Sequence, residues 1–334
     1  MSLKLSFAAL TDVGVERAEN QDAYGSAHLD GLDVYIVCDG MGGHAGGSTA
    51  SRLGVETIEK QLAASSGDVP TRVASAIEIA NTTIQALARE QRELYGMGTT
   101  VVALAVEHET NRAFVAHVGD SRIYRLRGRE MRRLTRDHTM VQRLVDDGIL
   151  TPEAAENHPN SNVISRSLGG RPTVDVELGP EPLDLREGDL FILCSDGLHG
   201  LVSEAEIARV ASSMAPDEAV RTLVQMANDA GGHDNITVEI VRVGAAADAV
   251  EDVDIVHPPP APGSRLAIAA ELAASGAHDA TPTPTAAGIP APGTPLDELS
   301  EPDEHRRMAG GPAIVIAAIV LAVIAIVLIA LGRG

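Results

Sequence analysis

Aromatic side chains are nearly absent from this sequence. Phe, Tyr and Trp together make up 2% of the 334 residues, and Trp does not occur at all. The hydrophobic share is nevertheless 44%, so Ala, Val, Leu and Ile must build the core. A chain of this length has enough of these residues for one large domain or two smaller ones.

Cysteine and basic residues are also scarce. Cys38 and Cys194 each end an apolar run, which favours buried thiols over a disulfide or a zinc site. The 26 Lys and Arg residues are outnumbered by 47 acidic residues, and the formal net charge is −21. Because binding to nucleic-acid phosphates needs cations, this charge argues against a nucleic-acid partner. It is compatible with divalent cations and with basic partners.

The two ends of the chain differ sharply in composition. The N-terminal "MSLKLSFAAL" is too short and too polar for a signal peptide. Residues 312–331 read "PAIVIAAIVLAVIAIVLIAL", and about 20 apolar residues can span a hydrocarbon layer of about 30 Å. Arg306 and Arg307 precede this run, which favours a cytoplasmic N-terminal side. The sequence therefore predicts a single-pass protein of the cell membrane whose main domain lies in the cytoplasm.

Composition divides the rest of the chain near Val243. Residues 244–311 are rich in Ala, Pro and acids and have almost no large apolar residues, so we expect a disordered linker. Residues 1–243 alternate apolar runs with turn signals and form the predicted globular domain. Its neighbouring strand-like runs are joined by hairpin-sized links, and its helical runs come in one pair early and again near the end. This order favours an α+β fold of antiparallel sheets with helices packed outside.

Aspartates recur beside glycine or at the ends of apolar runs within this domain. They are Asp22 in "ENQDAY", Asp39 in "VCDGMGGH", Asp120 in "HVGDSR", Asp196 in "LCSDGL" and Asp234 in "GGHDNIT". Each one alone could be a turn or cap residue. Together they are harder to explain as turn or cap residues. A carboxylate at the end of a buried strand costs free energy unless it is paired or binds a metal. An oxygen-only ligand set suits Mg²⁺ or Mn²⁺.

Glycine and arginine complete this candidate site. Gly40 can offer its carbonyl to a metal, and a small loop lets a phosphate approach the backbone closely. Two metal ions can bind a bridging water, lower its pKa and present hydroxide to phosphorus. Arg17 in "GVERAENQD" is a candidate for the phosphate oxygens, and a plain surface arginine is the alternative.

The ordered set of motifs resembles the metal-dependent protein phosphatase family, the protein phosphatase 2C-like Ser/Thr phosphatases, and most closely its bacterial members. The motifs are "GVERAENQD", "VCDGMGGHAGG", "MGTTVVAL", "HVGDSRIYRLR", "LTRDHT", "HPNSNVISRSLGG", "GDLFILCSDGL" and "GGHDNITV", and they cover about residues 6 to 243. The resemblance implies an α-β-β-α sandwich of two central antiparallel sheets flanked by helices.

The resemblance also implies roles for single residues. Asp39 would bridge two catalytic Mn²⁺ or Mg²⁺ ions, with the Gly40 carbonyl, Asp196 and Asp234 as further ligands. Asp22 would act through water in the outer coordination shell. A third ion would be held by Asp120 together with Asp196. Arg17 would bind the substrate phosphate, residues 138–168 would form a flap beside the site, and no covalent phosphoenzyme would form.

Two positions depart from the family pattern. Many eukaryotic members have a histidine directly after the "DG" pair, as a proposed general acid, whereas this chain has Met41. His44 is a candidate replacement, and the alternatives are a loop histidine bonded to backbone and protonation by a water. Gln21 stands where some relatives have Glu, which argues against a direct metal contact there. His138 and His233 are interpreted as structural.

The resulting hypothesis is metal-dependent hydrolysis of phosphoserine and phosphothreonine on proteins, opposing Ser/Thr protein kinases at the membrane. A membrane Ser/Thr kinase would be among the phosphorylated partners. The alternatives are a catalytically weak phosphoprotein-binding regulator of the same fold, and a regulatory phosphatase of an anti-sigma pathway.

Overall fold

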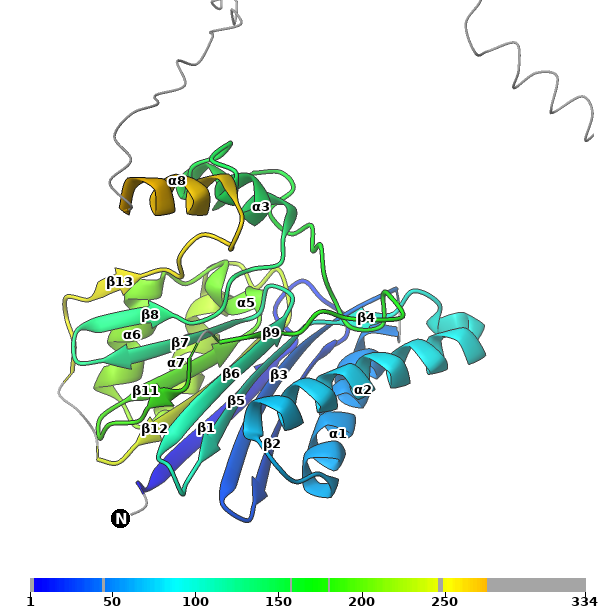
Figure 1. The fold of residues 1–334 in the computed structure, drawn as a ribbon, viewed down its shortest axis with the longest axis horizontal. Coiled ribbons are helices and arrows are strands. Elements are labelled where there is room, and N and C mark those ends of the chain that lie inside the picture. Colours follow the sequence, from blue (N-terminus) through cyan, green and yellow to red (C-terminus); the bar gives the residue numbers. More distant parts are fainter. Residues whose placement is uncertain (1–2, 44–45, 157, 180, 246–248, 275–334) are drawn as a thin grey trace, which may run out of the picture. The chain divides into compact units, whose positions relative to one another are not determined.

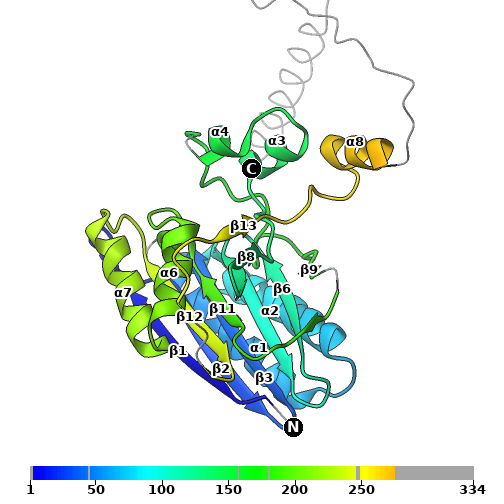
Figure 2. The same cartoon turned by 90° about the vertical axis from the view of Figure 1, so that its left-hand side faces the viewer.

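Two β-sheets stack face to face, and helices cover the outer face of each (Figures 1 and 2). The computed structural model describes residues 3–43, 46–156, 158–179, 181–245 and 249–274. Within these residues, the predicted α+β architecture of two antiparallel sheets flanked by helices is confirmed.

The first sheet carries the second half of the domain. Its strand order is β1 (Leu5–Asp12), β12 (Ile236–Val243), β11 (Leu190–Cys194), β7 (Arg122–Arg127), β8 (Glu130–Arg133) and β13 (Asp254–Val256). All neighbours are antiparallel except β13, which pairs with β8 in parallel. Its outer face is covered by α5 (Asp196–His199), α6 (Glu204–Ser213) and α7 (Pro216–Asp229).

The second sheet carries the first half. Its order is β10 (Leu183–Asp184), β6 (Arg112–Val118), β5 (Val101–Glu107), β3 (Leu32–Met41) and β2 (Asp22–Leu29), with β4 (Gly98–Thr99) on β3 and β9 (Glu177–Leu178) on β6. Helices α1 (Gly46–Ala64) and α2 (Val69–Glu90) pack on its outer face. A short 3₁₀ helix, η1 (Arg92–Leu94), follows α2. The flap segment contains α3 (Met140–Asp146) and α4 (Pro152–Glu156).

Alternation along the central strands sorts their side chains between two cores. On β3, Ile36 and Cys38 pack against α1 and α2, whereas Tyr35 and Val37 point between the sheets. Asp39 continues the second series, because successive side chains of a strand point to opposite faces. The same parity on β11 and β12 directs their odd-numbered residues between the sheets. The strand ends therefore deliver polar side chains into the space between the sheets.

The segment predicted as a disordered linker is structured in part. Residues 254–256 form β13, and residues 265–274 form helix α8 (Arg265–Ala274). The open edge of β8 offers backbone hydrogen bonds, which the low hydrophobicity of the segment does not reveal. The division into 1–243, 244–311 and 312–331 stays a prediction.

Membrane insertion is not visible in the described part of the chain. None of its helices is long and apolar enough to cross a bilayer. Residues 312–331, the predicted transmembrane helix, lie outside the described residues.

Candidate functional site

Asp22 and Asp39 stand directly opposite each other on β2 and β3, at the end of the space between the sheets. Asp22 is only 8% exposed, and its Oδ2 accepts hydrogen bonds from the hydroxyls of Ser195 and Thr237, both at 2.7 Å. Its Oδ1 is buried with no hydrogen-bond partner among the described residues. Burial, and secondarily the charges of Asp196 and Asp234, raise the pKa of Asp22 to about 7.

Asp39 lies at the centre of this carboxylate group. Its pKa is raised well above the usual range, first by burial and then by Asp22, Asp196, Asp120 and Asp234. Its backbone is fixed, because the Asp39 N–H donates to the Thr100 hydroxyl at 2.9 Å and the Asp39 carbonyl accepts from the Thr100 N–H at 2.8 Å. Asp39 is thus held rigidly in a place where its negative charge is strongly disfavoured.

Asp196 extends the group from the first sheet, directly after β11, and Asp120 from the link between β6 and β7 that joins the two sheets. Burial and then Asp234 raise the pKa of Asp196, and a hydrogen bond with the Asp39 carboxyl opposes them. The pKa of Asp120 is raised well above its usual range by burial and then by Asp196. One oxygen of each side chain is buried without a hydrogen-bond partner in the described part of the structure. Asp196 keeps partial access to solvent, whereas Asp120 is 4% exposed.

Arg17 reaches the group from the loop before β2. Its Nη2 lies 2.6 Å from Asp234 Oδ2, and its Nε donates to the His233 carbonyl at 3.3 Å. The Arg17 side chain is 50% exposed, so its guanidinium is at the open rim. Within the described residues this is the one ion pair to any of the five aspartates.

Gly40 is placed where no other residue fits. A Cβ on Gly40 would lie 2.2 Å from the Gly47 carbonyl oxygen and 2.4 Å from the Gln21 carbonyl oxygen. Its N–H donates to that Gln21 carbonyl at 3.1 Å. The backbone of β3 therefore passes through a tight channel beside Asp39, and the glycine is a steric requirement.

Asn235 joins the loops that carry these groups, a role that sequence reasoning missed. Its Nδ2 donates to the carbonyls of Val13 and Glu19 at 2.9 and 3.0 Å, and its Oδ1 accepts from the Gln21 N–H at 2.7 Å. Its own N–H donates to Asp234 Oδ1 at 2.8 Å. Its place directly after Asp234 was the only available signal, as it was for Ser195 directly before Asp196.

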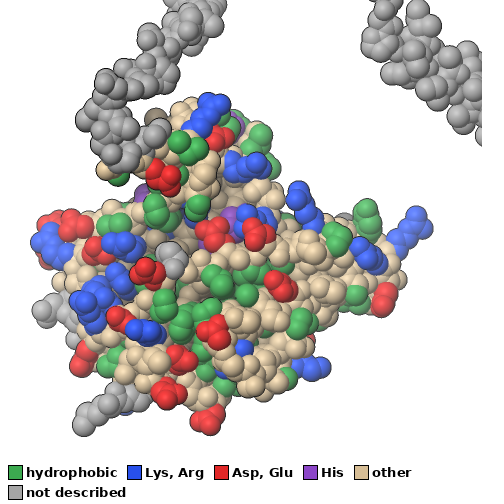
Figure 3. Space-filling model, in the orientation of Figure 1, with side chains coloured by type: hydrophobic (Ala, Val, Ile, Leu, Met, Phe, Trp, Pro, Cys, Tyr) green, Lys and Arg blue, Asp and Glu red, His purple; other side chains and the backbone are tan. Residues whose placement is uncertain are grey.

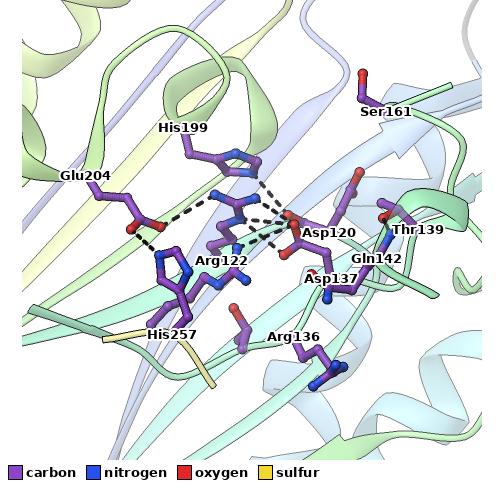
Figure 4. Close-up of polar contacts among 12 residues, drawn as sticks. Asp120, Arg122, Arg136, Asp137, Thr139, Gln142, Ser161, His199, Glu204 and His257 are labelled. Atoms are coloured by element: carbon purple, nitrogen blue, oxygen red, sulfur yellow. Dashed lines mark hydrogen bonds and ion pairs between the residues drawn. The ribbon is translucent and has the colours of Figure 1, made fainter. Parts of the chain in front are cut away.

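A second polar network lies behind Asp120 (Figure 4). His199 Nε2 lies 3.1 Å from the Asp120 carbonyl oxygen, and burial lowers the pKa of His199 to about 3. A neutral imidazole can therefore donate this hydrogen bond. Arg122 binds both oxygens of Asp137, with its Nη2 2.6 Å from Oδ2. Arg122 also lies 3.7 Å from Glu204.

His138 fastens the flap to the loop of Asp120. Its N–H donates to the Gly119 carbonyl at 2.9 Å, and its Nδ1 accepts from the Gly119 N–H at 3.0 Å. The proton of the neutral ring is then on Nε2, which lies 3.0 Å from Glu177 Oε2. His117 stacks on His138 with ring centroids 4.7 Å apart. These three side chains are close enough for a metal site, but the proton on Nε2 makes His138 a hydrogen-bond donor there.

The remaining predicted residues take other places. His44 lies outside the described residues. Gln21 directs its carbonyl to Gly40 and Ser51. The exposed His233 bonds to Glu16 at 2.9 Å, and its carbonyl accepts from Arg17.

The donor set fits hard divalent cations. Five carboxylates and one tightly packed glycine backbone meet at one end of the sandwich, and three buried carboxylate oxygens lack any donor among the described residues. Burial, and then mutual repulsion, raise the pKa values of four of these carboxyl groups. Mg²⁺ or Mn²⁺ would satisfy oxygen ligands of this kind and relieve the repulsion.

Comparisons with known proteins identify the family of this chain. The family model for protein phosphatase 2C matches residues 15–235. Protein phosphatase PhpP of Streptococcus pneumoniae is 41% identical over 248 residues, which are 72% of this chain and 98% of PhpP. Serine/threonine protein phosphatase PstP of Mycobacterium tuberculosis is 38% identical over 245 residues, covering 73% of this chain and 46% of PstP.

Solved structures give the same result. The crystal structure of the M. tuberculosis serine/threonine phosphatase PstP/Ppp matches with a TM-score of 0.66 and 36% identity, covering 72% of this chain and 99% of that one. The catalytic domain of PstP in complex with two manganese ions matches with a TM-score of 0.63 and 34% identity, covering 73% and 100%. The chain belongs to the protein phosphatase 2C family.

Proposed function

We propose that this protein-serine/threonine phosphatase hydrolyses phosphoserine and phosphothreonine on proteins with water activated by two Mn²⁺ or Mg²⁺ ions. The observation that supports this most strongly is the group of five aspartates. Burial and mutual repulsion raise the pKa values of four of them, three of their oxygens lack a hydrogen-bond partner, and Arg17 is the one cation paired with the group among the described residues. The metal dependence general to the family and the manganese-bound PstP structure point to the same ions.

Each protein ligand has a distinct place in this proposal. Asp39, Asp196, Asp234 and the Gly40 carbonyl would hold the two catalytic ions. Asp22 is kept in orientation by the Ser195 and Thr237 hydroxyls and acts through a water. Asp120 would hold a third ion together with Asp196, whose charge, after burial, raises the pKa of Asp120.

The chemistry is divided between the metal pair and the chain. When bound, the ions supply an activated water and neutralise phosphate oxygens. Arg17 leaves Asp234 and binds two phosphate oxygens with its guanidinium fork, which its exposed position allows. The hydrogen bonds of Asp39 with Thr100 hold its backbone in place, so that little reorganisation is needed there during phosphoryl transfer.

The proposed location is the inner face of the cell membrane. Residues 312–331 would form a single span, with the phosphatase domain in the cytoplasm. Anchoring would raise the effective concentration near a membrane Ser/Thr kinase and its substrates. Recovery of the full-length chain in the soluble fraction of cell lysates would contradict this part of the proposal.

The central test is release of phosphate from a phosphothreonine peptide by the full chain with Mn²⁺. Asp39→Asn should lower turnover by about 100-fold or more, because it removes the central ligand. Asp33→Asn is the matched control: it changes an aspartate on the same strand that pairs with His28 and His108 instead. Peptide binding without turnover in the unmodified chain would favour the phosphoprotein-binding alternative. Full activity of Asp39→Asn would contradict the metal mechanism.

A further inference from the structure

The chain continues past the family domain as an ordered segment that crosses to the flap. Residues 253–274, called the strap here, begin with Val253 against the core of the first sheet. They continue through β13 and end in α8. The described residues up to Ala274 belong to one compact unit. The protein phosphatase 2C match ends at residue 235, so the strap lies outside the matched residues.

Charge and backbone pairing hold the first part of the strap. The Asp254 N–H donates to the Arg129 carbonyl at 2.8 Å, and β13 then runs along β8. Asp252, just before the strap, lies 3.6 Å from Arg129. Figure 3 shows basic side chains gathered at this edge of an otherwise acidic protein. Asp252 and Asp254 therefore lie at an edge of the first sheet that carries several arginines.

His257 ties the strap to the network behind the site. Its Nε2 lies 2.8 Å from Glu204 Oε2, and Glu204 lies 3.7 Å from Arg122. Arg122 in turn binds Asp137, the residue before the start of the flap (Figure 4). A chain of polar contacts thus runs from the strap to the base of the flap.

Arg136 joins the strap directly to the flap helix. Its Nη1 donates to the Pro259 carbonyl, while its Nε donates to Asp146 Oδ2 at 3.1 Å. Asp146 is the last residue of α3, and it also accepts from Gln142 Nε2 at 2.9 Å. Arg136 and Asp146 are 8% and 6% exposed. One buried guanidinium therefore holds both the strap and the end of α3.

Helix α8 completes the contact with a small apolar surface. It lies beside α3 (Figures 1 and 2), and the Leu266 side chain lies over Gly148, just after α3. Leu266 remains 40% exposed, so this contact is weaker than core packing. The base of the flap is fixed independently, by the bridge of Thr139 with Ile164 and by the Ser165 N–H bond to the His138 carbonyl. The strap therefore acts on the outer part of the flap.

We propose that the strap positions α3 of the flap for protein substrates, with Arg136, His257 and Leu266 as positioning residues. A phosphoprotein reaches beyond the metal site to the flap, whereas a small aryl phosphate occupies only the site itself. Loosening the strap therefore weakens the recognition of protein substrates and leaves the chemistry of the metal site unchanged. The kinetic part of this inference rests on the proposed phosphatase function, and the docking part does not.

The experiment uses the full-length chain with two loosening variants, Leu266→Asp and His257→Ala. Leu266→Met and His257→Gln are matched controls that keep the apolar contact and a side-chain donor. Hydrogen exchange of amides 140–150 should rise about tenfold in the loosening variants and stay unchanged in the controls. The KM for a phosphothreonine protein should rise about fivefold, while kcat/KM for p-nitrophenyl phosphate stays within about twofold.

The two measurements separate the possible failures. Unchanged exchange of α3 in both loosening variants would overturn the docking of the strap. Equal losses for the protein and the aryl phosphate would overturn its role in protein recognition. A wild-type chain without turnover would refute the proposed function, and the exchange measurement would still decide whether the strap holds the flap.

Discussion

Asn235 is the residue on which the loops of the site depend. It is 4% exposed and binds the backbone of Val13, Glu19 and Gln21 while its own N–H holds Asp234. Residues that hydrogen-bond to metal ligands and orient them typically raise the affinity for the metal by about 10- to 100-fold. We therefore expect Asn235→Ala to weaken Mn²⁺ binding by about 10-fold or more, measured by titration calorimetry.

Asn81→Ala is the matched control for this prediction. Asn81 is a buried asparagine of α2 that also binds backbone, at Arg171 and Gly169, away from the carboxylates. Its loss should lower stability without changing the affinity for Mn²⁺. Similar losses of affinity in both variants would show that the effect of Asn235 is general destabilisation.

Glu239 is a buried acid that the site does not use. It points between the sheets from β12, and neither carboxylate oxygen has a well-formed hydrogen bond within the described residues. Burial, and then the charge of Glu59, raise its pKa well above the usual range. The folded state thus holds a proton that the unfolded chain releases near pH 4.5, so this residue lowers stability increasingly as pH rises above that value.

Glu239→Gln should remove this pH-dependent cost. Each unit of raised pKa corresponds to about 1.4 kcal/mol, and 1 kcal/mol shifts the Tm of a domain of this size by about 2–4 °C. We expect the Tm of the variant to match the wild type near pH 4.5 and to exceed it by several degrees at pH 8. Thermal unfolding with saturating Mn²⁺ measures this while the metal site stays filled. An equal gain at both pH values would show that the charge is not the cause.

The sequence revealed the aspartates of the group because Asp39, Asp120 and Asp196 follow apolar runs beside glycine, and Asp234 follows a glycine pair. It did not reveal which hydroxyls bind Asp22, because Ser195 and Thr237 are more than 170 positions away along the chain. The pairing of β11 with β12 brings these hydroxyls together, and no local sequence pattern encodes that pairing.

At the scale of elements, local signals succeeded where burial and periodicity agreed. The β5–β6 and β7–β8 hairpins form at the predicted links. Strand β2 lacks a clear alternating pattern, because Gly25 and small polar residues interrupt it. A Cβ on Gly25 would lie 2.3 Å from Val55 Cγ1, so packing of α1 against β2 requires the glycine that hides the strand. Strand β13 depends on the free edge of β8, which lies far earlier in the chain.

Helix α6 begins with a side-chain cap that stabilises it. Ser203 Oγ accepts from the Glu206 N–H at 3.3 Å, and Glu206 Oε2 accepts from the Ser203 N–H at 3.2 Å. Loss of such a cap typically costs about 1 kcal/mol. Ser203→Ala should therefore lower the Tm by about 2–4 °C with unchanged kcat. Ser213→Ala, at the other end of α6, removes a hydroxyl that caps no N–H and should change the Tm less.

At the scale of the whole molecule, the sandwich concentrates charge that the domain cannot neutralise by itself. Segments from positions 17 to 234 meet between the sheets, and the described residues contribute one ion pair to five aspartates. Repulsion within this group opposes folding, whereas the surrounding hydrogen bonds and strand pairing hold it together. The stability of the domain should therefore depend on bound cations.

Mn²⁺ should stabilise the protein by mass action. Binding to the folded state alone adds about 2.7 kcal/mol at a free ion concentration 100 times Kd, which raises the Tm by about 5–10 °C for a domain of this size. Asp39→Asn should lose most of this rise, and in EDTA it should melt above the wild type, because it removes a buried charge whose pKa is raised by burial and four carboxylates. Differential scanning calorimetry with EDTA and with Mn²⁺ measures both effects. If Mn²⁺ raised the Tm of Asp39→Asn as much as that of the wild type, the ions would bind elsewhere, and the carboxylate group would not be the metal centre.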